Sequence, residues 1–506
     1  MALYLIGIGG TGAKCIEAVI QMAAVGLFTS DSIKILFIDA DEANGNLERA
    51  RSSLSIYQKS FGLFGIEKQD ISWMKTPIKS FGLWSPFANK TSNKNLGAFF
   101  NYNNLKQNYQ ALGNLFDVLY TQEERSVDLD VGFRGRPAIG SAIMSQVDLD
   151  SLDEEPWQTL IAEIQNDAGS GTQTKILLCG SIFGGTGASG LPTIGRLLAN
   201  KLTKISVRER VKLACLFALP YFGFTPRQGE NPDAVYARSD LFLLNTEAAL
   251  RFYVTQAKQT FDTVYLLGNQ NLTSVQFSIG KNTQRNDPHF IELYAALAAR
   301  HFLLQQQIER GAVILIGRQE LGTISWDDIP EGAIVKTELV NATRFAYAWL
   351  ANTVPELEQA KLKGVDWAQQ HLVWFSKFYR PNQGVLNRLL GNKGVDLPDL
   401  TQESEQEAIR TFSSWCQDYL RWLHFIHKCE SDSIRLFTHR EFTPDTPLKK
   451  EVFSTLIIDD SRDETRRRSD NLLDLHLQLM SNVANLTPPI QGTVGLAKSL
   501  YKICRL

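Results

Sequence analysis

The feature that most constrains this chain is the glycine-rich stretch Gly180–Pro192, which reads GSIFGGTGASGLP. It follows the short apolar run Ile176–Cys179, typical of a buried strand, and precedes Thr193–Leu198, which has the apolar spacing of a helix. Glycine lets the backbone approach a ligand closely and adopt a positive φ. A strand, a glycine loop and a helix start together aim backbone N–H groups at a phosphate. No Gly-Lys-Ser or Gly-Lys-Thr follows, so this is not the usual P-loop.

A second glycine loop, Gly7–Gly12, follows an N-terminal strand predicted at Ala2–Ile6 and leads into a predicted helix. The next strand, predicted at Ile33–Ile38, ends in Asp39 and Asp41. This G-x-G-x-x-G spacing with an acid after the second strand also fits the dinucleotide fingerprint. A Rossmann enzyme that uses NAD or FAD, or that adenylates its substrate, therefore stays an alternative.

A third loop, Gly132–Gly140, combines glycines with Arg134, Arg136 and Pro137 and precedes another helix-like run. The planar guanidinium groups of the two arginines suit the oxygens of a phosphate. On these residues alone a solvated turn is the favoured explanation of the loop. Its place between a predicted strand and a predicted helix nevertheless matches the other two loops.

The three loops, in this order, resemble those of the tubulin/FtsZ superfamily. Gly-Gly-Thr-Gly at Gly184–Gly187 resembles its phosphate-binding signature, and the loop Gly132–Gly140 is similar to the Gly-Ala-Gly-Gly-Asn-Pro loop of FtsZ. The segment Phe261–Gln270 resembles a family strand whose asparagine contacts the nucleoside, which assigns that role to Asn269. The resemblance covers about residues 2–330.

A later segment, Gly322–Pro330, is similar to the family loop whose acids complete the active site of a neighbouring subunit. Asp327 falls on the first acid of that loop, and Asp328 is the candidate to replace the second. The resemblance thus implies that hydrolysis depends on contact between two copies of the chain.

The expected fold is α/β: a tubulin/FtsZ-like nucleotide-binding domain with a parallel sheet flanked by helices, a central helix at Asp287–Leu304, and a diverged, largely helical C-terminal region. We expect a GTP-binding domain at 1–285, with an insertion of helices and loops at about 42–128. A central helix and second domain follow at 286–400, and a helical region at 401–506. Helical periodicity predicts helices over Glu356–Phe378 and Gln402–Lys428.

The resemblance implies GTP or GDP as the ligand, with Mg²⁺, and a GTPase that assembles into cytoskeletal filaments of a prokaryotic kind. Its expected ligand-binding residues are Gly9, Gly10, Thr11, Gly12, Asp41, Gly135, Arg136, Gly184, Gly185, Thr186, Gly187 and Asn269. The alternative of the same fold is a non-polymerising nucleotide switch or scaffold that acts with partner proteins, bound through the C-terminal region. The second acid of the family loop has no direct counterpart in this chain, so a protein that binds the nucleotide and assembles but hydrolyses it slowly fits equally well.

Composition excludes several other classes. The net charge of −2 does not suggest a nucleic-acid binder, and the apolar runs are too short to cross a bilayer. The cysteines are scattered without C-x-x-C spacing, which favours reduced thiols in a cytoplasmic protein. His424, His427 and Cys429 lack a fourth ligand, so no metal site of the protein's own is predicted. The many aromatic residues of the insertion are expected in the core.

Overall fold

The computed structural model describes residues 1–64, 71–88, 94–149, 154–224, 237–278, 280–317, 325–381, 397–429, 434–438, 448–458, 462–481, 485–486 and 491–506. The chain divides into two compact units. Unit 1 consists of Met1–Val19, Ser30–Ser52 and Thr76–Leu321, and unit 2 consists of Ile20–Thr29, Ser53–Lys75 and Gly322–Leu506. Within the described residues, no helix combines the length and the apolar character that a membrane span requires.

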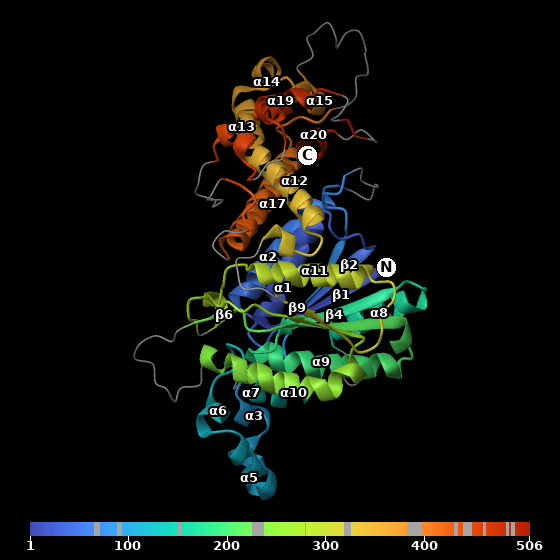
Figure 1. The fold of residues 1–506 in the computed structure, drawn as a ribbon, viewed down its shortest axis with the longest axis vertical. Coiled ribbons are helices and arrows are strands. Elements are labelled where there is room, and N and C mark those ends of the chain that lie inside the picture. The colour runs from blue at the N-terminus through green and yellow to red at the C-terminus, as the bar shows by residue number, and fades with distance from the viewer. Residues whose placement is uncertain are drawn as a thin grey trace. The chain divides into compact units, whose positions relative to one another are not determined.

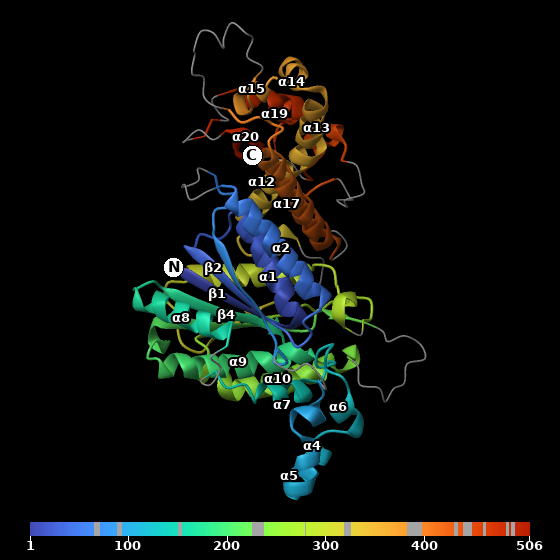
Figure 2. The ribbon, with the colours of Figure 1, turned by 180° about the vertical axis from the view of Figure 1, so that it is seen from behind.

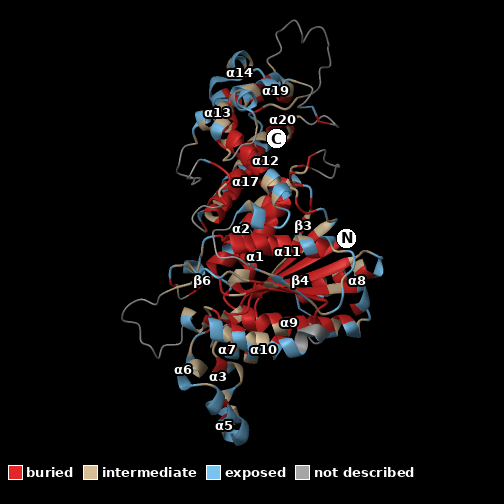
Figure 3. Cartoon of the chain, in the orientation of Figure 1, coloured by how far each residue is buried: buried red, intermediate tan, exposed pale blue. Residues whose placement is uncertain are grey.

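Unit 1 is built on a seven-stranded sheet in the order β3-β2-β1-β4-β5-β7-β9, and the neighbouring strands run parallel. Its strands are β1 (Ala2–Ile8), β2 (Ser32–Ile38), β3 (Ile78–Trp84), β4 (Thr174–Ser181), β5 (Val211–Ala218), β7 (Thr263–Leu267) and β9 (Ala312–Ile316). Two short strands, β6 (Phe222–Gly223) and β8 (Thr273–Ser274), pair separately. β1 and β4 are buried along their whole length, as Figure 3 shows, because helices cover both faces of a parallel sheet.

Helices form a layer on each face of this sheet. The helices of the first part of the chain are α1 (Gly9–Ala24), α2 (Gly45–Gly62), α3 (Leu96–Phe99), α4 (Tyr102–Asn108), α5 (Gln110–Leu119), α6 (Gln122–Ser126), α7 (Pro137–Met144), α8 (Trp157–Gly169), α9 (Gly185–Lys204), α10 (Phe242–Thr260) and α11 (Phe290–Leu304). Figures 1 and 2 show α1 and α2 on one face of the sheet and α9 and α10 on the other. Figure 1 places the central helix α11 on the same face as α1.

Unit 2 is largely helical. Its helices are α12 (Gly332–Ala348), α13 (Val354–Lys363), α14 (Val365–His371), α15 (Phe375–Phe378), α17 (Glu403–Lys428), α18 (Glu464–Ser469), α19 (Leu472–Gln478) and α20 (Gly492–Cys504). Its core contains a cluster of aromatic rings. Trp73 stacks on Tyr501 with the ring centroids 5.2 Å apart, and it also contacts Phe345 and Trp415.

The predicted fold class is confirmed: an α/β architecture with a parallel sheet, helices on both faces, a central helix and a largely helical C-terminal region. Two elements differ from expectation. The edge strand β3 comes from the stretch 42–128, where only helices and loops were expected. The helix expected at Glu356–Phe378 is broken at Gly364, whose φ of +90° an L residue rarely adopts.

The aromatic residues of the stretch 42–128 lie mostly in the cores, as expected. Trp84 and Phe87 are buried in the cluster that fills the space between the sheet and α7, α8 and α9, whereas Trp73 belongs to the core of unit 2. This cluster anchors the loop after β4 through Ile182 and the beginning of α9 through Leu191.

Candidate functional site

A cavity opens in unit 1 where the central strands end. Its walls include residues from the segments that follow the strands, namely Gly9–Lys14 after β1, Asp39–Asn46 after β2, Ser181–Gly187 after β4 and Phe222–Phe224 after β5, together with the loop Val131–Gly135 and the segment Ser278–Asn286. The cavity has a volume of about 120 Å³ and is partly open to solvent. Open parallel sheets bind ligands at the carboxyl ends of their strands, which is where this cavity lies.

Two helices begin at this cavity. α1 starts at Gly9 and α9 at Gly185, and Gly184, the residue before α9, has no side chain to cap the helix. The first backbone N–H groups of a helix lack partners within it and carry a partial positive charge. Gly9 has a φ of +74°, and a Cβ there would lie 3.3 Å from Cβ of Thr186, so the two helix starts are adjacent. They form an anion site suited to phosphate.

The third glycine loop, Val131–Gly135, meets the first two. Gly132 has a φ of +84°, and a Cβ built on it would lie 3.7 Å from Cβ of Asp41 and 3.9 Å from the hydroxyl oxygen of Thr186. The positive φ favours glycine here, and these ordinary contact distances place the loop beside the end of β2 and the start of α9. All three glycine loops surround one cavity.

Two carboxyl groups at the end of β2 line the same cavity. Asp39 is 3% exposed, its Oδ1 accepts the N–H of Asp41 at 3.1 Å, and its Oδ2 has no hydrogen-bond partner among the described residues. Burial raises the pKa of Asp39 to about 8. Asp41 accepts the N–H groups of Ala43 at 3.2 Å and Lys281 at 2.6 Å, and burial raises its pKa as well. These are hard oxygen donors of the kind that Mg²⁺ takes together with phosphate oxygens and water.

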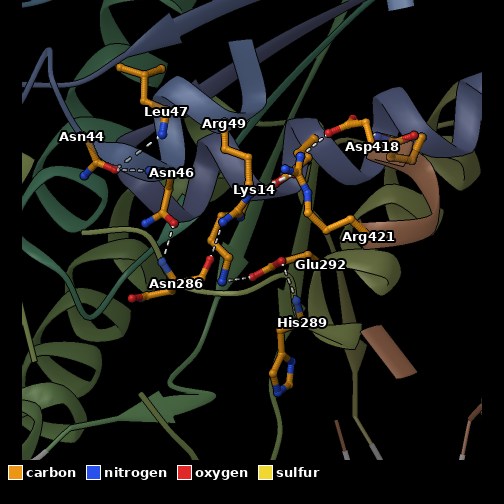
Figure 4. A network of polar contacts seen from close by, with 12 residues as sticks. Lys14, Asn44, Asn46, Leu47, Arg49, Asn286, His289, Glu292, Asp418 and Arg421 are labelled. Carbon is orange, nitrogen blue, oxygen red and sulfur yellow. Dashed lines mark hydrogen bonds and ion pairs between the residues drawn. The ribbon is translucent and has the colours of Figure 1, made fainter. Parts of the chain in front are cut away.

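Lys14 of α1 brings a buried positive charge to the cavity. It forms an ion pair with Glu292 of α11, and Figure 4 shows the two side chains reaching toward each other. Glu292 also accepts the hydroxyl of Tyr221 and the N–H of His289, each at 2.8 Å. Burial and the charge of Lys14 lower the pKa of His289 to about 3, so this imidazole is neutral at physiological pH.

The remaining walls are of two kinds. Carboxamides line one side, from Asn44, Asn46, Gln284 and Asn286. Aromatic rings line another, from Phe183, Phe222, Phe224 and Phe242. A ligand in this cavity therefore meets amide hydrogen-bonding groups as well as apolar surface for a planar ring.

The structure brings most of the sequence-predicted ligand residues together. Those that line the cavity are Gly9, Gly10, Thr11, Asp41, Gly135, Gly184, Gly185, Thr186 and Gly187. Arg134 lines it too, and its guanidinium donates to the backbone oxygen of Asp128 at 3.0 Å.

Other predicted residues lie elsewhere among the described residues. Gly12 packs against the sheet, where a Cβ would come within 2.5 Å of the backbone oxygen of Cys179. Arg136 precedes α7, with its Nε 3.9 Å from Glu124. Asn269 follows β7 and donates to the backbone oxygen of Asn271 at 2.8 Å.

The predicted acids Asp327 and Asp328 belong to unit 2 and are exposed. The residues 322–324 of their loop lie outside the described part of the chain. Asp328 has a local role, because its carboxylate accepts the N–H of Ser325 at 2.7 Å and the hydroxyl of the same residue at 3.1 Å. Neither acid is among the residues that line the cavity of unit 1.

Sequence reasoning missed Lys14, the carboxamides and the aromatic wall. Lys14 lies in the second turn of the helix after the first glycine loop, a position from which its proximity to the loop could have been inferred. Asn44-Gly45-Asn46 comes shortly after the acids that follow β2. Gln284 and Asn286 carry no comparable signal, because only the folded chain brings them to α2.

No protein-family model and no curated protein matches this sequence. Among solved structures, the chain is similar to a GTPγS-form protofilament of Bacillus thuringiensis serovar israelensis TubZ. The two sequences are 13% identical, the match covers 60% of this chain and 55% of that chain, and the TM-score is 0.23. The chain thus matches only about 55% of the length of this neighbour.

Proposed function

We propose that this chain is a nucleotide-binding protein of the tubulin/FtsZ kind, which binds GTP in the cavity of unit 1 and assembles with copies of itself. The observation that carries the proposal is the convergence of three glycine loops on one cavity, two of them directly after strands of the sheet, with two helix N-termini aimed into it. A dinucleotide fingerprint needs only the first of these loops.

The residues present fit a magnesium ion beside the phosphates. Asp39 and Asp41 offer carboxylate oxygens, and Oδ2 of Asp39 lacks any other partner among the described residues. Mg²⁺ is commonly held by one or two carboxylates and by the phosphates of the substrate. A bound Mg²⁺ would neutralise part of the phosphate charge. The hydroxyl group of Thr186 also lies beside Asp39.

Hydrolysis of GTP would need little covalent chemistry from the protein, because phosphoryl transfer depends mainly on positioning and on stabilising charge. The first turns of α1 and α9 would hold the phosphates through backbone N–H groups. In the proposed assembly, exposed Asp327 of a neighbouring copy would orient the attacking water, so the rate of hydrolysis would depend on protein concentration.

The test combines sedimentation with release of inorganic phosphate, measured in the same samples with GTP, GDP, ATP or no nucleotide. We expect pelleting that requires GTP, and phosphate release that rises more than linearly with protein concentration. Asp327→Ala should keep GTP binding and lose phosphate release. Glu358→Ala, which removes another exposed acid of unit 2, is the control and should match the wild type.

Absence of nucleotide binding to the wild-type protein would overturn the proposal. Binding of NAD or FAD in place of GTP would favour the Rossmann alternative. Tight binding of GTP without pelleting at any concentration would leave the non-polymerising switch as the function.

One observation favours that second function. Helix α5 exposes an apolar stripe of Leu112, Leu115, Val118 and Leu119, each more than half exposed. Exposed apolar patches of this kind often mark sites of protein interaction. A partner protein bound there would give a nucleotide-controlled scaffold without a filament.

A further inference from the structure

A short segment before α11, Gly280–Asn286, lies along one wall of the cavity and is here called the strap. Its first part contacts the nucleotide-binding loops: the N–H of Lys281 donates to Asp41 at 2.6 Å, and its ammonium pairs with Asp130 at 3.0 Å. A Cβ on Gly280 would lie 2.8 Å from Cβ of Val131, so the backbone of the strap packs tightly there.

The end of the strap is anchored on α2. The N–H of Asn286 donates to Oδ1 of Asn46 at 2.9 Å, and its backbone oxygen accepts the guanidinium of Arg49 at 2.6 Å. Arg49 is in turn held by Glu17 of α1, with both Nε–O distances at 2.9 Å and both side chains buried. Figure 4 shows this chain of contacts from Arg49 and Asn46 to Asn286. Because these hydrogen bonds tie the backbone of Asn286 to two buried side chains, the strap has a fixed position relative to α2.

These contacts determine which way the carboxamides face. A carboxamide has an acceptor oxygen and a donor nitrogen, and its orientation follows from its partners. Oδ1 of Asn46 accepts a backbone N–H of the strap, which leaves Nδ2 as the group free for a ligand. Oδ1 of Asn44 accepts the N–H of Asn46 at 2.9 Å, and its Nδ2 donates to Oε1 of Gln284 at 3.1 Å. Gln284 is thereby left with its own nitrogen as a donor.

The result is a wall of hydrogen-bond donors. Among the described residues, Nδ2 of Asn46 and Nε2 of Gln284 have no hydrogen-bond partner, although Asn46 is only 2% exposed. A Cβ on Gly10 would lie 3.2 Å from Nδ2 of Asn44 and 3.3 Å from Nδ2 of Asn46. The amides therefore lie beside the first turn of α1, whose backbone N–H groups are also donors without partners in the helix. Donors that converge from two sides select a group made of acceptors, as a phosphate is.

We propose that the amide nitrogens of Asn44, Asn46 and Gln284 face the phosphate chain of the bound nucleotide, and that the strap residue Asn286 is a positioning residue whose backbone keeps Nδ2 of Asn46 turned toward the ligand. This inference rests on the proposed nucleotide binding. It adds contacts from α2 to those of the glycine loops, and it makes the strap part of the binding site.

The test replaces one donor nitrogen by an oxygen of the same size. Asn46→Asp keeps the oxygen that accepts the N–H of Asn286 but turns Nδ2 into a carboxylate oxygen that faces the phosphate. Asn95→Asp is the matched control, since Asn95 also accepts a backbone N–H, at the start of α3, and does not line the cavity. The dissociation constant for GTP is measured with Mg²⁺ present, and the melting temperature is measured without nucleotide.

We expect Asn46→Asp to weaken GTP binding by about tenfold or more, because it loses a hydrogen bond to a charged group and gains repulsion. Because Asn46 is only 2% exposed, the new carboxylate should lower the melting temperature, so binding is compared at a temperature where the variant is folded. Gln284→Glu makes the same exchange on the strap and should also weaken binding, and it keeps the test decisive if Asn46→Asp does not fold. Asn95→Asp should bind like the wild type.

Wild-type protein that binds no GTP would overturn the proposed function, and this inference with it. If the wild type binds GTP and both Asn46→Asp and Gln284→Glu bind it within twofold of the wild type, the inference alone is wrong. An equal loss in Asn95→Asp would show a general effect of added negative charge, and it too would contradict the inference.

Discussion

Asp39 is an acid in an environment that disfavours its charge. It lies at the end of a buried strand, 3% exposed, and one of its oxygens has no hydrogen-bond partner among the described residues. Burial raises the pKa of Asp39 to about 8, and the hydrogen bond from the Asp41 backbone offsets only part of that rise. When it is ionised, such a group lowers the free energy of unfolding. Acids with perturbed pKa values are found preferentially at functional sites.

The first prediction follows from this raised pKa. Between the usual pKa near 4 and the folded value of about 8, the unfolded chain has released the proton while the folded chain retains it, so stability falls as pH rises. Asp39→Asn should be equal in stability to the wild type near pH 4 and more stable at pH 9, by at most about 5 kcal/mol. Urea unfolding of both proteins without nucleotide across this pH range measures it. Parallel curves would contradict the burial argument.

The central helix α11 is held at both ends by side chains. At its N-terminus, Nδ1 of His289 accepts the N–H of Ile291 at 3.1 Å, and Glu292 accepts the N–H of His289 in return. At its C-terminus, the ammonium of Lys175 donates to the backbone oxygens of Phe302, Leu303 and Gln305 at 2.6–2.8 Å. These contacts satisfy backbone groups that every helix end leaves unpaired.

The second prediction concerns the N-terminal cap. The pKa of His289 is lowered to about 3, so stability is lost as pH falls from the ordinary value of 6.5 toward 3, where the unfolded chain binds a proton first. Asn also caps a helix but does not titrate, and His289→Asn should therefore lose less stability than the wild type on acidification. Thermal unfolding between pH 4 and 8 measures this slope. Exposed His371→Asn is the control and should leave the slope unchanged.

The third prediction concerns the C-terminal end of α11. Lys175→Met gives a side chain of similar length but removes three hydrogen bonds from a charged donor. The backbone oxygens at the end of α11 then lose this hydrogen-bond donor. We expect a loss of about 2–4 kcal/mol in the free energy of unfolding. Lys212→Met, in the residue paired with Lys175 on β5 and only half-buried, is the comparison and should cost much less. Similar losses in the two variants would argue against the proposed helix cap.

At the scale of the whole molecule, unit 2 is assembled from three separate stretches of the chain. Ile20–Thr29 and Ser53–Lys75 belong to it, although the residues around them in sequence belong to unit 1. Trp73 is fully buried in unit 2, against Phe345, Trp415 and Tyr501 from its later part. The early stretches therefore depend on residues more than 250 positions later for their burial.

The fourth prediction is that the fragment 1–321 does not fold cooperatively. Without the later residues, the ring of Trp73 and its neighbours lose their packing partners and present apolar surface, which promotes aggregation. We expect the fragment to be insoluble, or to bind a hydrophobic dye and lack a sharp melting transition. The full chain under the same conditions is the reference. A soluble fragment with a cooperative transition would show that unit 1 folds by itself.

Much of unit 1 could be predicted from the sequence. The predicted strands at Ala2–Ile6, Ile33–Ile38 and Ile176–Cys179 correspond to β1, β2 and β4, because a continuous apolar run between turn residues suits a strand buried on both faces. β3 was missed, since its sequence IKSFGLW is partly exposed and lacks such a run. The sequence predicted where helices occur better than where they end. The break at Gly364 depends on its positive φ, which the apolar periodicity does not reveal.

The sequence by itself determined the backbone part of the site. A glycine loop between a strand and a helix positions N–H groups through local geometry alone, so the loops at Gly9 and Gly184 could be found without a structure. The loop at Gly132 also lines the cavity, but it follows α6 and not the strand that was predicted before it. The charges and amides around them were decided only by the tertiary structure. Lys14 meets Glu292, and Asn46 meets Asn286, across more than 200 residues, and burial sets the protonation of Asp39. Such contacts depend on packing between distant segments, which local patterns do not contain.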